Sequence, residues 1–354
     1  MLMEREEGWN LMFMAQAFLV DTQQSGPRGS DKLYSTNWGM VSAGHPLGGG
    51  SVLLKTMLSL EPATVTDRRY PELFQTGETA YGIPLVNAQH PHNFVMELSA
   101  QYAHPLGANA MLNLYYAPVG DPALGPVAFP HRASAAEIPQ APLGHHWQDS
   151  THIADNVATV AVRHKWLRVE ASGFYGSEPD ENRWNIDWGG MNSYSARVSV
   201  APTQSWMAQV SAGRLTKPER QEQGDVVRTT ASVSYTRGGW SSSLIWGRNH
   251  QTFTRHALNS VLSGELRAVA PEEFFHRPCR GGGQGRTLRA RDLSRLHPGY
   301  RNLQRRRDRP GSEHLRVQDS SGSSDGAQPA PVRRQCVFEA AAEVGNNIGA
   351  SSAR

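Results

Sequence analysis

Apolar and polar residues alternate along much of the chain before about residue 264. The clearest stretch, 227–236, places Val, Thr, Ala, Val and Tyr on one face and Arg, Thr, Ser, Ser and Thr on the other. A period of two puts successive side chains on opposite faces of a β-strand. The same alternation predicts strands over 194–200, 206–212, 167–175 and 108–116, and further strands over 9–21, 36–44, 50–61, 95–104, 156–165 and 239–250.

The connections between these strands alternate between short and long. Short turn sequences such as Pro202-Thr-Gln204 and Gly238-Gly239 separate neighbouring strands, which is typical of antiparallel hairpins. Long loops are expected over 62–94, 117–155 and 176–192. We therefore predict an all-β, antiparallel up-and-down meander of about eleven or twelve strands, judged from this hairpin spacing.

Two architectures fit such a meander, namely a soluble sandwich or barrel and a transmembrane β-barrel. The predicted strands have about the 9–11 residues that a tilted strand needs to cross a bilayer. Trp and Tyr recur near strand ends, and the polar face is rich in Ser, Thr, Gln and Arg. Aromatic girdles and a polar interior are typical of outer-membrane barrels. We predict an incomplete transmembrane β-barrel over 1–264, with a soluble β-protein as the alternative.

The composition changes abruptly at the end of this region. Residues 1–264 carry a net charge of −3 and all nine Trp, whereas 265–354 carry +6 and no Lys. The calculated pI of 8.9 is therefore set by the tail and does not indicate a nucleic-acid partner. A segment rich in Arg, Gly and Ser and free of Lys is typical of a GC-rich gene that is translated in the wrong reading frame. We interpret 265–354 as frameshifted or disordered, and the nucleotide sequence would decide between the two.

The first residues, Met1 to Gly8, are acidic and lack the basic, apolar and small-residue regions of a secretory signal. Taken literally, this predicts a cytoplasmic protein. We prefer an internal start codon that omits an export signal, because the strand pattern favours the outer membrane.

Histidines gather in two of the predicted long loops. One cluster is Gln89-His-Pro-His-Asn93 together with Glu97, and the other runs from His145 to His152. Imidazole is a good ligand for Zn, Cu and Ni. The favoured interpretation is that these histidines pack the loops through hydrogen bonds and that the chain has no cofactor. A site for a divalent metal is the alternative. The candidate metal ligands are His90, His92, His145, His146 and His152.

The second cluster also permits a hydrolase. Ser150 and His152, with Asp149 or Asp155, have the residue types of a catalytic triad, and His145 or His146 could replace His152 as the base. A nucleophile needs a base within hydrogen-bonding reach and an oxyanion hole, and closeness in sequence provides neither. A membrane-embedded hydrolase is therefore kept only as a further alternative, and we assign no catalytic residue.

Several motifs together resemble a known group of proteins. They are Thr22-Gln-Gln-Ser-Gly-Pro-Arg28, Asn37-Trp-Gly-Met40, Gln89-His-Pro-His92, the Pro-rich run 117–126, Leu143-Gly-His-His146, Asp149-Ser-Thr-His-Ile153 and Glu178-Pro-Asp-Glu-Asn-Arg-Trp184. These strings look like an uncharacterised family of predicted bacterial outer-membrane β-barrel proteins, over residues 8–264. The resemblance implies an exported barrel without an established activity.

The leading hypothesis is a non-enzymatic outer-membrane barrel that is a channel for small polar solutes or metal ions. Its partners would be outer-membrane lipid and those solutes. Val198, Val210 and Val233 are expected to point outward. The residues expected to face the lumen are Arg168, Glu170, Arg197, Gln209 and Arg228. The alternatives are a soluble β-protein that binds carbohydrate or metal, and the hydrolase.

Overall fold

The computed structural model describes residues 2–6, 8–149, 154–218, 224–252, 259–268 and 342–343. Chain contacts separate one unit, Met1–Ala268 with Val337–Arg354, from a second, Val269–Cys336. All described residues belong to the first unit, so the interpretation of 265–354 as frameshifted or disordered lies almost wholly outside them. Only the end of β15 and the two residues of β16 fall within that range.

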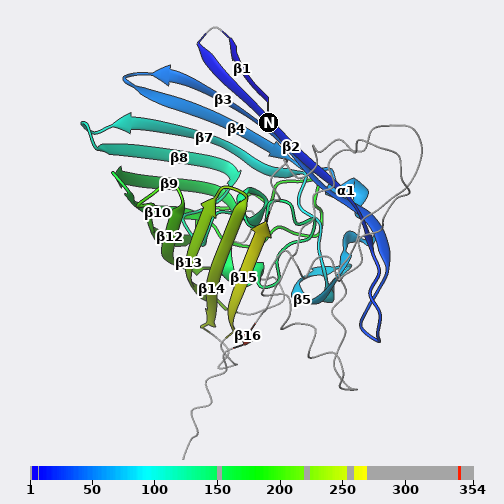
Figure 1. Ribbon diagram of the computed structural model, residues 1–354. Helices are drawn as coiled ribbons and strands as arrows, with labels where there is room; N and C mark the ends of the chain where they lie inside the picture. The colour runs from blue at the N-terminus through cyan, green and yellow to red at the C-terminus, as the bar shows by residue number, and fades with distance from the viewer. Residues whose placement is uncertain are drawn as a thin grey trace, which may run out of the picture. The chain divides into compact units, whose positions relative to one another are not determined.

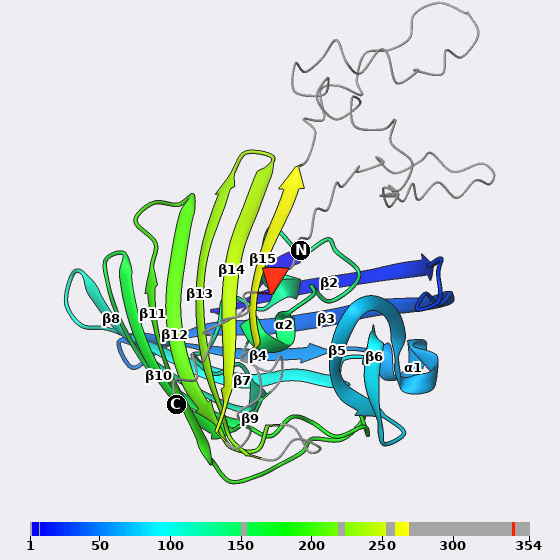
Figure 2. The same ribbon diagram turned by 90° about the horizontal axis from the view of Figure 1, so that it is seen from below.

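The described part of the chain is all-β and forms one large antiparallel meander (Figures 1 and 2). Within the described residues the large sheet has fourteen strands, which follow chain order except that β5 and β6 are left out. β1 and β16 stand at the two ends of this order and the sheet is not closed. The strands are β1 (Leu2–Glu6), β2 (Trp9–Thr22), β3 (Lys32–Leu47), β4 (Gly50–Leu58), β7 (Val95–Pro105), β8 (Ala110–Gly120), β9 (Ala154–His164), β10 (Leu167–Tyr175), β11 (Ser193–Val200), β12 (Trp206–Leu215), β13 (Val226–Arg237), β14 (Trp240–Gln251), β15 (Asn259–Ala268) and β16 (Ala342–Glu343).

The large sheet exceeds the expected eleven or twelve strands because β1, β15 and β16 were not predicted. β1 and β16 have five and two residues, and β15 crosses residue 264, where the predicted barrel region ends. The expected loop 62–94 contains a separate two-stranded sheet, β5 (Tyr70–Ala80) with β6 (Ile83–Gln89). Its register shifts twice along its length, which removes a regular alternation. The short helices α1 (Glu61–Thr64) and η1 (Thr66–Arg68) precede it, while η2 (Phe129–His131) and α2 (His145–Gln148) lie in the loop after β8.

The outer face of the large sheet is apolar and exposed. Val162, Val169, Val198 and Val210 are consecutive register partners on β9, β10, β11 and β12. We call these four residues the outer valine row. Each is between 42% and 57% exposed, although they lie in the middle of regular strands. A soluble protein would normally cover such a continuous aliphatic row.

The inner face of the same strands is polar and buried. Glu170 and Arg197 are register partners, and the row continues through Ser211 to Thr230 on β13. Glu170 is 3% exposed and Thr230 is fully buried. This arrangement inverts the usual rule, in which apolar side chains fill the interior and polar ones meet solvent.

The inner face is covered by residues 121–149, which we call the inner segment. The backbone N–H of Ala123 donates to Ser172 Oγ at 2.8 Å, and that of Gly125 donates to Ser211 Oγ at 2.8 Å. A small apolar core that includes Leu124, Phe174 and Leu215 lies beside these contacts. The inner face of the sheet thus packs against a folded stretch of its own chain.

Gly125 permits the close approach of the two ends of the inner segment. Its φ is +80°, and a Cβ there would lie 2.6 Å from the carbonyl oxygen of Gln148. Gly107, with a φ of +81°, has nothing within 4 Å of a built Cβ. A left-handed backbone costs an L-residue roughly 1–2 kcal/mol in either place. Only Gly125 adds a steric clash.

We expect Gly125→Ala to lower the free energy of unfolding by about 1–3 kcal/mol more than Gly107→Ala, because the clash adds to the same backbone strain. Urea unfolding of both variants, followed by tryptophan fluorescence, measures this difference. Equal losses in the two variants would show that the ends of the inner segment do not pack as described.

Candidate functional site: a buried cluster of histidines and carboxylates

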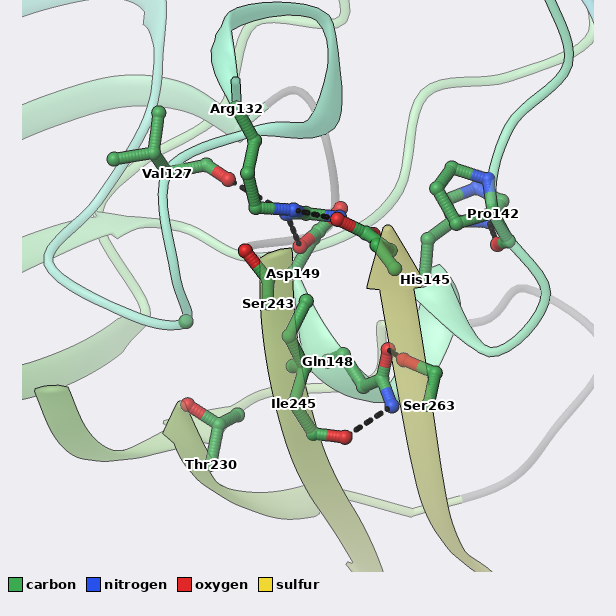
Figure 3. Close-up of polar contacts among 12 residues, drawn as sticks. Val127, Arg132, Pro142, His145, Gln148, Asp149, Thr230, Ser243, Ile245 and Ser263 are labelled. Carbon is green, nitrogen blue, oxygen red and sulfur yellow. Dashed lines mark hydrogen bonds and ion pairs between the residues drawn. The ribbon is translucent and has the colours of Figure 1, made fainter. Parts of the chain in front are cut away.

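The inner segment is held against the sheet by a buried group of charges. Arg132 donates through Nε to Glu265 Oε2 at 2.7 Å, and its Nη1 lies 3.4 Å from Asp149 Oδ1. The same Nη1 donates to the carbonyl oxygen of Val127 at 2.7 Å (Figure 3). Arg132, Asp149 and Glu265 are all at most 5% exposed. One arginine therefore links both ends of the inner segment to strand β15.

A short helix completes the attachment. Gln148, the last residue of α2, donates to the carbonyl oxygen of Ile245 at 3.0 Å and accepts from Ser263 Oγ at 2.8 Å (Figure 3). These contacts join the helix to β14 and β15. They place His145 and His146, the first two residues of the same helix, on the inner side of the sheet.

Burial raises the pKa of Asp149 to about 6 from its ordinary 3.8, against the opposing effect of the nearby Arg132. The folded chain therefore holds this proton more tightly than the unfolded chain does. The stability that Asp149 contributes is greatest below about pH 4, falls as the pH rises through the window to about 6, and does not fall further above it.

We expect the parent chain to lose on the order of 2 kcal/mol of unfolding free energy relative to Asp149→Asn as the pH rises from 4 to 7, because only the parent chain has a carboxyl group to ionise at this position. Denaturant unfolding of both proteins at several pH values measures it. A difference that stays constant across this window would contradict the pKa assigned to the Asp149 carboxyl.

Three of the predicted metal ligands meet inside the sheet. His90 follows β6, and His145 and His146 form the first turn of α2. One candidate ligand atom from each lies within 4.8 Å of the others. The rings of His145 and His146 are 4.1 Å apart between centroids, and those of His90 and His146 are 5.5 Å apart. All three side chains are buried.

Two carboxylates from other segments join these histidines. Glu78 of β5 and Glu178 of the 176–192 connection each place an oxygen within 4.8 Å of a His146 nitrogen. Glu78 Oε1 lies 2.9 Å from His90 Nε2, and Glu78 also forms an ion pair with Arg183. Arg183 in turn donates to Asn93 Oδ1 at 3.1 Å. We call His90, His145, His146, Glu78 and Glu178 the histidine cluster.

The remaining predicted ligands lie elsewhere. His92 turns away from the cluster, and its Nδ1 lies 2.9 Å from Glu61 Oε1. Burial alone would lower the pKa of His92. The negative charge of Glu61 and its hydrogen bond to the ring together outweigh burial, so the pKa of His92 is raised above its ordinary value. His152 lies outside the described residues, as does Ser150, so the catalytic triad proposed for a hydrolase is not placed by the structure.

The five residues expected to face a lumen all lie on the polar inner face. Arg168 and Arg197 each contact Glu170 at 2.8 Å, which forms a three-residue charge group. Gln209 donates to Thr230 Oγ1 at 3.0 Å, and Arg228 donates to the carbonyl oxygen of Asp149 at 2.8 Å. Several of these side chains therefore contact other protein groups, and whether they line a path for solutes stays a prediction.

The sequence reasoning missed Glu78 and Glu178 as neighbours of the histidines. Glu78 lies on β5, which pairs with the strand that ends at the first histidine motif, and Glu178 lies in the 176–192 connection. Neither has a local pattern that marks it as a neighbour of the histidines. It also grouped Glu97 with the first motif, whereas Glu97 pairs with Lys55 at 2.9 Å. The motif Glu178-Pro-Asp-Glu-Asn-Arg-Trp184 could be singled out in the sequence, but nothing in it indicates that Glu178 lies beside the histidines.

A scan against protein-family models finds no family that matches this chain, and a search of curated proteins finds no similar sequence. No helix among the described residues has the length and apolar character required to traverse a lipid bilayer.

Proposed function

We propose that this chain is a non-enzymatic β-barrel protein of a bacterial outer membrane. The observation that carries the proposal is the outer valine row, which is exposed over four paired strands while the opposite face is polar and buried. An apolar exterior around a polar interior is the arrangement expected of a barrel whose outer face contacts lipid.

Exposed aromatic side chains at both ends of the strands support the same proposal. Trp166, Trp206 and Trp240 lie at the turns β9–β10, β11–β12 and β13–β14, which share one edge of an antiparallel meander. Tyr116 and Tyr194, each more than 40% exposed, lie toward the opposite edge. Trp and Tyr collect at both membrane interfaces because their rings are apolar and their N–H or O–H groups are polar.

In this proposal the inner segment is a plug. It binds the polar face through Ser172, Ser211 and Glu265, so the interior is occupied by protein at these positions. A channel for small polar solutes or metal ions would then pass beside the plug or open when it moves. The charge group around Glu170 lies on the face that such a path would follow.

Heat-modifiable migration of the full chain, refolded in detergent micelles, tests the proposal. A transmembrane barrel resists SDS until it is boiled, so unboiled and boiled samples should migrate differently. The refolded chain should also remain with vesicles after alkaline carbonate washing. Identical migration, together with full solubility in buffer without detergent, would instead establish the soluble β-protein.

A further inference from the structure

We propose that His90, His145 and His146 bind one divalent transition-metal ion of the Ni, Cu and Zn class, with Glu78 and Glu178 as neighbouring carboxylates. The inference concerns the histidine cluster alone and does not depend on the chain being in a membrane. It assigns to this cluster a ligand of definite chemistry.

The hydrogen bonds of two of these rings already match those of metal-binding histidines. Nδ1 of His145 lies 3.0 Å from the carbonyl oxygen of Pro142, and Nδ1 of His90 lies 3.0 Å from that of Pro91 (His145 and Pro142 are shown in Figure 3). A carbonyl accepts only from a protonated nitrogen, so these two contacts favour the tautomer with the proton on Nδ1, whereas the contact of Gln75 Nε2 with His145 Nδ1 at 3.3 Å favours the other tautomer of that ring. With the proton on Nδ1, the neutral ring offers the Nε2 lone pair, and such second-shell bonds orient metal ligands.

The contact between His90 and Glu78 places a carboxylate beside the proposed site. The Nε2 atom of His90 lies 2.9 Å from a Glu78 oxygen. A metal ion bound to this nitrogen would therefore have a carboxylate oxygen close by as a further ligand, and zinc sites in proteins combine imidazole with carboxylate donors.

Nitrogen donors determine the class of ion. Mg²⁺ and Ca²⁺ prefer oxygen ligands, whereas imidazole suits Zn, Cu and Ni. The carboxylate of Glu78 is already neutralised by Arg183, so the cluster does not present the excess negative charge that a calcium site uses. The three imidazoles therefore form the primary donor set.

The amide of Gln89 holds the metal-free cluster together. Gln89 Nε2 lies 3.3 Å from His145 Nε2, and its Oε1 lies 3.4 Å from His146 Nε2. Gln75 donates to the same Oε1 at 2.9 Å. Metal binding would require the Gln89 amide to turn away from His145 Nε2 and the ligand atoms to draw closer than 4.8 Å.

The ion would connect segments that are far apart in the sequence. His90 follows the β5–β6 sheet, His145 and His146 belong to the inner segment, and Glu178 belongs to the 176–192 connection. A metal bound by these residues fastens the inner segment to the β5–β6 sheet in addition to its attachment to β14 and β15. Its removal should loosen that contact without unfolding the large sheet.

Zinc titration of the refolded full chain, produced without a histidine tag and stripped with EDTA, tests the proposal. Isothermal calorimetry and elemental analysis after dialysis against Zn²⁺ should both give one ion per chain. His145→Asn should keep a donor toward Pro142 but lose the metal ligand. His145→Asn and His146→Ala should each weaken zinc binding by more than the about 10–100-fold that a lost second-shell partner costs.

His164→Ala is the matched control, because His164 is an exposed residue at the end of β9. It should bind zinc as the parent chain does. The visible spectrum of bound Co²⁺ gives a second measurement that does not depend on stability. It should be lost in His145→Asn while tryptophan fluorescence and circular dichroism still show a folded β-protein. Zinc binding unchanged by His145→Asn and His146→Ala, or reduced equally by His164→Ala, would overturn the site.

Discussion

Val210→Arg is expected to lower the free energy of unfolding in a lipid bilayer by about 2–4 kcal/mol, the range found for Arg near the midplane of outer-membrane barrels. Val210 is 57% exposed and is the member of the outer valine row that lies in the middle of β12. If that row contacts hydrocarbon, the guanidinium must be drawn out of water. In an aqueous environment the same change at an exposed position would typically alter stability by less than about 0.5 kcal/mol.

Urea unfolding of the chain in phosphatidylcholine vesicles measures the effect of Val210→Arg. The matched control is Gln204→Arg, because Gln204 is an exposed residue in the turn between β11 and β12. It should change the unfolding free energy little. Equal and small effects at both positions would indicate that the outer valine row meets water.

The second large effect is expected at Arg132. Arg132→Ala leaves the buried carboxyl groups of Glu265 and Asp149 without their cation, and breaking one partner of a buried ion pair costs about 3–5 kcal/mol. In the proposed barrel the loss falls mainly on the attachment of the inner segment. Denaturant unfolding should show the lower stability, and planar bilayers should show larger or more frequent conductance steps.

A compensated variant separates the charge effect from simple loss of packing. Arg132→Met combined with Glu265→Gln and Asp149→Asn removes all three charges while keeping similar volumes. It should recover most of the stability that Arg132→Ala loses, because no buried carboxylate then lacks a cation. An Arg132→Ala chain as stable as the parent would contradict the anchoring role assigned to this arginine.

The large sheet could be predicted from sequence because its strands obey one strict rule. The alternation over 227–236 corresponds to β13, observed over Val226–Arg237, and the stretch 206–212 lies within β12. Each residue of these strands lies on either the buried polar face or the exposed apolar face, and the face determines whether its side chain is polar or apolar. The β5–β6 sheet could not be found in this way, because its register shifts break the period.

The histidine cluster could be predicted only in part. Histidine is a common metal ligand, so the residue type alone identifies His90, His145 and His146 as candidates. Glu78 is one of several acidic residues in the chain and lies in an irregular strand, so nothing in the sequence distinguishes it. His90 joins the cluster and His92 does not, because Glu61 binds both the backbone N–H and the ring of His92. Such partners come from contacts across the fold, and local sequence carries no signal for them.

Spin-label accessibility along β12 tests the central claim most directly. Single cysteines at positions 207–212, in a chain with Cys279 and Cys336 replaced by serine, would be labelled in vesicles. Collision with oxygen, which concentrates in lipid, is compared with collision with a water-soluble nickel chelate. We expect oxygen contact to peak at every second residue, at Ala208, Val210 and Ala212, and to fall at Gln209 and Ser211. Nickel contact that peaks at Val210, with no preference for oxygen there, would contradict a lipid-facing outer surface.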